Sequence, residues 1–159
     1  QIWSFGYVFV DALAIAAQTL VSEYKTKFHD YRNSYLKKYI NKLTLRISLF
    51  LFIFSSIFLD ALITLITDKS LSLFIDFELR ILFGLSLLIG GFAFLWDGVL
   101  LGLDKSREFS SLTVVSSIFG FVSCSYLLNF ENSLSSLWIA LNLSLLYRGV
   151  AGFLYQIRD

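Results

Sequence analysis

The sequence predicts an all-α integral membrane protein with five transmembrane helices, and three observations support this. Of the 159 residues, 57% are hydrophobic and 16% are charged, with a mean hydropathy of +0.72. A soluble domain averages about 45–50% apolar and about 25% charged residues. The apolar residues form five long runs, each able to cross a hydrocarbon core of about 30 Å as a helix. Short hydrophilic connections separate the runs, so we expect residues 1–159 to form a single transmembrane domain.

The expected spans follow one another with no proline to kink them. They cover about Ile2–Glu23, Thr44–Thr67, Phe77–Leu103, Ser110–Leu128 and Leu134–Ile157. A connection as short as Asp104–Glu108 implies that the helices it joins are antiparallel neighbours.

The first span carries a polar stripe, in which Ser4, Asp11 and Gln18 recur every seven residues. Its nine Leu, Ile, Phe and Val residues make insertion into the bilayer more favourable by only about 3–5 kcal/mol. A central Asp makes insertion less favourable by about 2.5–3.5 kcal/mol. This helix therefore needs protein or water beside it. Two interpretations stay open. The stripe lines a cavity, or neighbouring helices satisfy it while alanines such as Ala14 and Ala17 allow close packing.

Aromatic residues at helical spacing, Phe28, Tyr31, Tyr35 and Tyr39, precede the second span. They form either an interfacial aromatic belt, the interpretation we favour, or a contact with anionic lipid. Within that span we expect Asp60 to form hydrogen bonds near the outer interface.

The third span contains Asp97 inside an apolar run. Its fourteen Leu, Ile, Phe and Val residues between Ile81 and Leu103 make insertion into the bilayer more favourable by about 4–8 kcal/mol. The helix can therefore insert with the carboxylate in place. A charge in such a place marks function or a specific pairing. A face of small residues, which lets helix backbones approach closely, accompanies it: Gly84, Gly91, Gly98 and Gly102.

The fourth span has a second face of small residues, and the fifth span contains an arginine inside an apolar run. Ser116, Gly120 and Cys124 allow close packing of the fourth span. Arg148 lies about 14 Å inside the end of the fifth span, and Asp97 about 9 Å inside the corresponding end of the third. We therefore expect Asp97 and Arg148 to pair or to share a water-filled pocket. The alternative is that Arg148 extends to the headgroups.

Lysine and arginine counts predict the orientation. Residues 24–46 hold seven, Asp104–Glu108 two and the C-terminal segment one. Of the two intervening connections, the first is assigned Lys69 and Arg80, and the second has none. We expect the basic loop 24–46 and the C-terminus to be cytoplasmic, in a plasma (inner) membrane.

Three segments resemble multidrug and toxic compound extrusion (MATE) transporters of the DinF-like branch. Asp11-Ala-Leu-Ala-Ile-Ala-Ala-Gln-Thr-Leu-Val-Ser22 resembles their eighth helix, Phe94-Leu-Trp-Asp-Gly-Val-Leu-Leu-Gly102 their tenth, and Leu146-Tyr-Arg-Gly149 their last. The resemblance covers the whole chain in order and spacing. It implies helices eight to twelve of twelve, that is, most of a six-helix C-terminal lobe. The missing partner would be the N-terminal lobe of the same protein.

The resemblance implies a secondary active antiporter that exports drugs or metabolites in exchange for protons or sodium. Asp11, Gln18, Asp97 and Arg148 are the candidates for ion coupling and transport. The expected partners are the lipid bilayer and a small organic substrate, with no nucleic acid. We expect no cofactor beyond the coupling ion, no metal site and no enzyme activity, because the chain has one His and one Cys. Two alternatives remain: a lipid-linked oligosaccharide flippase of a related fold, and a non-transporting membrane scaffold subunit.

Overall fold

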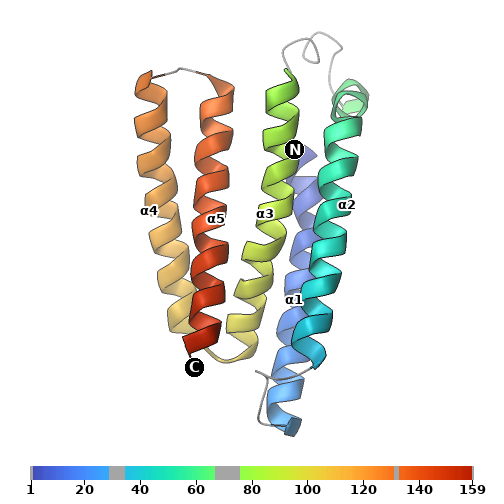
Figure 1. Cartoon of the computed structure of the whole chain (residues 1–159), viewed down its shortest axis with the longest axis vertical. Coiled ribbons are helices and arrows are strands. Elements are labelled where there is room, and N and C mark those ends of the chain that lie inside the picture. The colour runs from blue at the N-terminus through green and yellow to red at the C-terminus, as the bar shows by residue number, and fades with distance from the viewer. Residues whose placement is uncertain (1, 29–34, 67–75, 131–132, 159) are drawn as a thin grey trace.

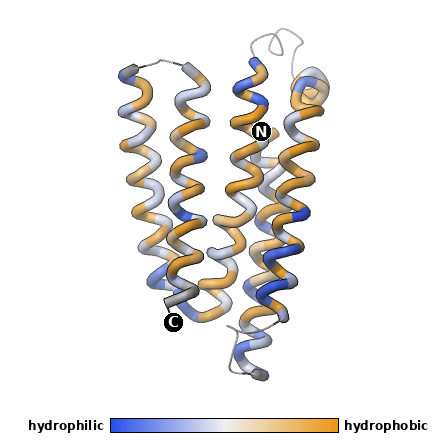
Figure 2. The backbone as a smooth tube through the Cα atoms, in the orientation of Figure 1, coloured by the Kyte–Doolittle hydropathy of each residue, from blue (hydrophilic) through white to orange (hydrophobic). Residues whose placement is uncertain are grey.

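The computed structural model describes residues 2–28, 35–66, 76–130 and 133–158, and these ranges form five α-helices (Figure 1). The helices are α1 (Ile2–Phe28), α2 (Tyr35–Ile66), α3 (Phe77–Gly102), α4 (Ser106–Phe130) and α5 (Leu134–Arg158). All five are long and apolar enough to cross a membrane. Figure 2 shows hydrophobic positions along the whole bundle and hydrophilic positions at the lower ends of α1, α2 and α4.

Helix α3 is the centre of the bundle. It packs against α1, α2 and α5, whereas α4 packs mainly on α5 at the edge of the molecule (Figure 1). Over half of its apolar stretch is buried, a larger share than in any other described helix. The run that carries Asp97 is therefore surrounded by protein on several sides. This explains how α3 can hold a charge that a lipid-facing helix would expose to hydrocarbon.

The predicted glycine face of α3 is confirmed as a packing surface, and two helices, α1 and α2, pack against it. Gly84 and Gly91 lie against α2, the latter directly against Ser48, whereas Gly98 and Gly102 lie against α1. A Cβ at Gly98 would collide with the backbone carbonyl of Ala14. Close backbone approach of this kind requires the absence of a side chain. The glycines therefore fix how near α1 and α2 lie to the central helix.

The small face of α4 packs on α5, as predicted. The Ser144 hydroxyl donates a hydrogen bond to the Ser116 carbonyl at 2.7 Å. A Cβ at Gly120 would lie 2.9 Å from the Ser144 Cβ, so this approach also depends on a glycine. Cys124 is a free, half-buried thiol on the same helix.

A tight turn joins α3 to α4. The Lys105 N–H donates to the Leu100 carbonyl and the Asp104 N–H to the Leu101 carbonyl, with Asp104 in the left-handed region at φ 63°. This is the Schellman pattern that ends a helix. Lys25 of α1 donates to the Leu103 carbonyl at 3.0 Å and pairs with Asp104 at 2.8 Å. A cation at the negative end of α3 thus ties α1 to this turn.

The helices extend further than the expected spans where the chain is basic. α1 continues to Phe28, and α2 begins at Tyr35 rather than near Thr44. Hydropathy reports where the apolar stretch ends, whereas Lys and Arg are good helix formers that continue a helix into the headgroup region. Tyr35 and Tyr39 are exposed at the start of α2. Tyr31 lies outside the described residues.

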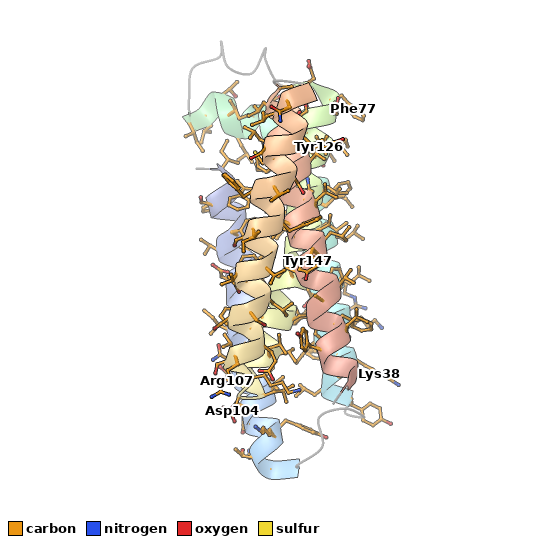
Figure 3. The ribbon with its side chains drawn as sticks, turned by 90° about the vertical axis from the view of Figure 1, so that its left-hand side faces the viewer. Lys38, Phe77, Asp104, Arg107, Tyr126 and Tyr147 are labelled. Atoms are coloured by element: carbon orange, nitrogen blue, oxygen red, sulfur yellow. The ribbon has the colours of Figure 1, made fainter. Side chains whose placement is uncertain are left out.

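The ends of the helices agree with antiparallel up-and-down packing. Figure 3 places Lys38, Asp104 and Arg107 at one end of the bundle, and Phe77 and Tyr126 at the other. The C-terminus lies at the first of these ends (Figure 1). The basic segments that we expect on one side of a membrane therefore gather at one end.

Candidate functional site

Asp97 of α3 and Arg148 of α5 form a two-point ion pair in the interior of the bundle. Arg148 Nε donates to Asp97 Oδ1 at 3.1 Å, and Arg148 Nη2 lies 2.7 Å from Asp97 Oδ2. The side chains are 8% (Asp97) and 17% (Arg148) exposed. A hydrogen bond between a guanidinium and a carboxylate is charge-assisted and is among the stronger polar contacts in proteins. The predicted pairing of Asp97 with Arg148 is confirmed.

The two helices can hold this pair because small residues let them approach each other. A Cβ at Gly152 would lie 2.8 Å from the Trp96 Cβ, so α5 passes close to α3 one turn beyond Arg148. Gly149, the residue after Arg148, lies beside Ala93. A Cβ at Gly149 would make only an ordinary contact, 3.6 Å from the nearest atom, so the close approach of α5 to α3 depends on Gly152. In the Asp-Gly dipeptide, by contrast, the residue after the charge is itself a close-packing position, because Gly98 lies directly against the backbone of α1.

Aromatic rings cover the guanidinium. The Arg148 Cζ lies 5.4 Å from the centroid of the Phe94 ring and 5.7 Å from that of Phe109. Both distances suit a cation–π interaction, which gains strength where water is excluded. Arg148 therefore points to Asp97 between rings of α3 and α4. Its extension to the headgroups, the alternative interpretation, is wrong for this conformation.

An aromatic cluster from three helices adjoins the pair. Tyr7 of α1 packs its ring on Phe94 with centroids 5.0 Å apart, and its hydroxyl donates to the Ser86 carbonyl at 3.2 Å. Trp3 donates through Nε1 to the Ser86 hydroxyl at 3.0 Å and contacts the ring of Trp138. Polar groups of buried aromatic residues are thereby satisfied.

Asp11 and Gln18 do not join the ion pair. Both are exposed, together with Ser4, whereas Val10 and Ala17 of the same helix are buried. The polar stripe of α1 therefore lies outside the packed face, and the small residues make the contact with α3. The interpretation in which other described helices satisfy the stripe is wrong. The cavity-lining interpretation stays a prediction.

A second ion pair lies nearer the opposite end of the bundle. Arg80 Nη2 is 2.6 Å from Asp60 Oδ2, with side chains 30% and 39% exposed. In the count of basic residues Arg80 belongs to the connection before the third span, and for Asp60 we expect only hydrogen bonds. Arg80 instead lies in the first turn of α3. The sequence does contain a signal for this pair: Asp60 lies near the end of the second span and Arg80 near the start of the third, which places them at similar depth.

The aromatic residues around the pair were also missed. Apolar spans contain many aromatic residues, so nothing in the sequence separates Tyr7, Phe94 and Phe109 from the rest. Only Phe94 could have been linked to the pair, by its position in the helix relative to Asp97. Phe94 lies three residues before Asp97 and therefore on a neighbouring part of the same face.

No protein-family model, curated protein or solved structure matches this chain. The resemblance to MATE transporters therefore stays a prediction.

Proposed function

We propose that the chain forms most of one lobe of a MATE-type secondary active antiporter. In this proposal the helices correspond to numbers eight to twelve, and the lobe exports a small organic substrate against an inward flow of protons or sodium. The observation that carries the proposal is the buried Asp97–Arg148 pair within membrane-spanning helices. Ionisable groups at such depths mark ion or substrate pathways by default.

The pair supplies a group for which an ion can compete. A proton or sodium ion that binds the Asp97 carboxylate competes with Arg148 for it, because the guanidinium lies against both carboxylate oxygens. The released guanidinium then lies between Phe94 and Phe109 without its anion. Such a change of partner costs several kcal/mol unless packing changes with it. Ion binding is therefore coupled to a rearrangement of α3 and α5.

The exposed stripe of α1 supplies the substrate-facing surface in this proposal. Asp11 lies near the middle of its span, where contact with lipid would cost about 2.5–3.5 kcal/mol. Water or a second lobe on this side removes that cost. Alternating access would then come from one lobe rocking against the other about a polar interior. The side that carries Asp11 and Gln18 is thus our candidate for the face toward the substrate.

A scaffold subunit is the second candidate, and one observation favours it. Two of the intramembrane carboxylates, Asp97 and Asp60, pair with arginines, as a non-transporting protein would arrange them. Asp11 does not fit this account, because it is exposed. A flippase receives less support, since Asp97 neutralises Arg148 and leaves it no free charge for a lipid phosphate.

Transport by the full-length protein in proteoliposomes tests the proposal. We expect a proton or sodium gradient to drive uptake of a fluorescent organic cation, and Asp11→Asn to abolish it. Asp60→Asn is the matched control, because it also neutralises an intramembrane carboxylate, but one that pairs with Arg80 and lies outside the polar stripe of α1. An absence of gradient-driven uptake across a panel of organic cations and anions would contradict the exporter and favour the scaffold.

A further inference from the structure

A groove of about 790 Å³ runs between α2 and α5 over the face of α3. α2 and α5 both pack on α3 without packing on each other, so α3 forms the floor. The walls are almost entirely apolar and include Phe92, Leu146 and Val150. One end is different, because Lys38, Asn41 and Lys42 of α2 line it. The groove thus joins a long apolar surface to a small cationic end.

Positive charge at this end has no described counterion. Lys38 and Lys42 are one helical turn apart and both exposed, and no carboxylate of the described residues pairs with either. Lys38 also lies close to the start of α2, whose first turn has no acidic residue. The positive end of a helix macrodipole therefore adds to the two ammonium groups. An anion at this position would interact favourably with all three.

We propose that the groove binds an anionic phospholipid of the surrounding bilayer, with its phosphate between Lys38 and Lys42 and an acyl chain along Phe92 and Val150. Lys38 lies at the end of the bundle that also carries Asp104 and Arg107 (Figure 3). Under the predicted orientation this end faces the cytoplasm, where the leaflet is enriched in anionic lipids. The charge of the groove and the composition of that leaflet are complementary.

A protein segment is a poorer occupant for this groove. A helix seated on the apolar walls would leave both lysines without an anion unless it also carried a matching carboxylate. A phospholipid supplies the phosphate and the hydrocarbon in one molecule, in the order that the groove presents them. The volume is within the range of about 300–1,000 Å³ typical of ligand sites, which suits a headgroup with part of one chain.

Lipid titration of the purified full-length protein, followed by native mass spectrometry, tests the cationic end. We expect phosphatidylglycerol to bind more tightly than phosphatidylcholine. Neutralising both lysines in Lys38→Gln/Lys42→Gln should weaken phosphatidylglycerol binding by roughly 30-fold, at about 1 kcal/mol for each charge. Arg107→Gln removes a cation at the same end but outside the groove, and it should leave the affinity unchanged. Equal affinity for the two lipids would overturn the proposal.

Filling the apolar part tests the position of the acyl chain. Val150→Trp places a large ring in the groove at a residue that is 52% exposed, and Val122→Trp does the same on α4 at 58% exposure. We expect only the former to reduce phosphatidylglycerol binding. Inorganic phosphate alone should fail to compete, since it lacks the chain. Competition by inorganic phosphate, equal effects of the two Trp variants, or a changed oligomeric state with unchanged lipid binding would each contradict the proposal. Helix content by circular dichroism confirms that the variants are folded.

Discussion

The guanidinium of Arg148 contacts both carboxylate oxygens of Asp97, across the interface of two helices that are long and apolar enough to cross a membrane. The contact joins α5 to α3 at the depth where each residue alone would be costly to insert. Phe94 and Phe109 lie over the guanidinium, and the side chains of Arg148 and Asp97 are only 17% and 8% exposed. This makes each of the two charges dependent on the other.

Removing one charge should therefore cost more than removing both. We expect Arg148→Gln to lower the free energy of unfolding by about 3–5 kcal/mol, because it leaves Asp97 as a buried charge without a partner. The double variant Asp97→Asn/Arg148→Gln should recover most of this loss, since two neutral amides can bond to each other. Reversible unfolding of the four proteins in mild detergent gives the coupling energy. Additive effects of the two substitutions would contradict the pair as a stabilising unit.

Two glycines, Gly98 of α3 and Gly149 of α5, should respond differently to substitution by alanine. Gly98→Ala should destabilise by about 1–3 kcal/mol, because its Cβ meets the Ala14 carbonyl and α1 has to move. Gly149→Ala should be neutral or should stabilise by up to about 1 kcal/mol. Its Cβ would lie 3.6 Å from the nearest atom, and alanine is the better helix former. Thermal unfolding of both variants compares them. A similar loss for both would show that close approach at Gly98 is unimportant.

The second ion pair should contribute less than the first. Asp60 and Arg80 are 39% and 30% exposed, so water or headgroups screen their attraction. We expect Asp60→Asn to change the free energy of unfolding by no more than about 1 kcal/mol. The same unfolding assay measures it beside Arg148→Gln. A loss as large as that of Arg148→Gln would place Asp60 in a drier environment than its exposure indicates.

The predicted orientation can be measured with single cysteines. The chain has one cysteine, so Cys124→Ser gives a cysteine-free background. On it, Asn129→Cys should react with a membrane-impermeant maleimide in intact cells, and Arg107→Cys only after permeabilisation. Both positions are exposed, and they lie towards opposite ends of α4. The reverse labelling pattern would invert the topology and move Lys38 and Lys42 to the outer leaflet.

Much of the fold was predictable because each span is an apolar run long enough to cross a bilayer. The pairing of Asp97 with Arg148 was predictable from helical rise, which places both residues at similar depth. The start of α2 at Tyr35 was not, because lysines end an apolar run without ending a helix. The Asp60–Arg80 pair was missed because Arg80 was assigned to a connection. The faces of individual helices depend on packing, so the sequence alone left open whether Asp11 is exposed or covered.

Efflux by cells that carry the full-length protein is the most direct test of Asp97 as the coupling group. At equal amounts of protein in the membrane, we expect Asp97→Asn to reduce efflux of a transported dye on the order of tenfold or more. The amide of Asn has no negative charge with which to bind the coupling proton or sodium ion in competition with Arg148. Asp60→Asn should transport as the unsubstituted protein does. Unchanged efflux by Asp97→Asn would contradict the account and leave the Asp97–Arg148 pair a purely structural contact.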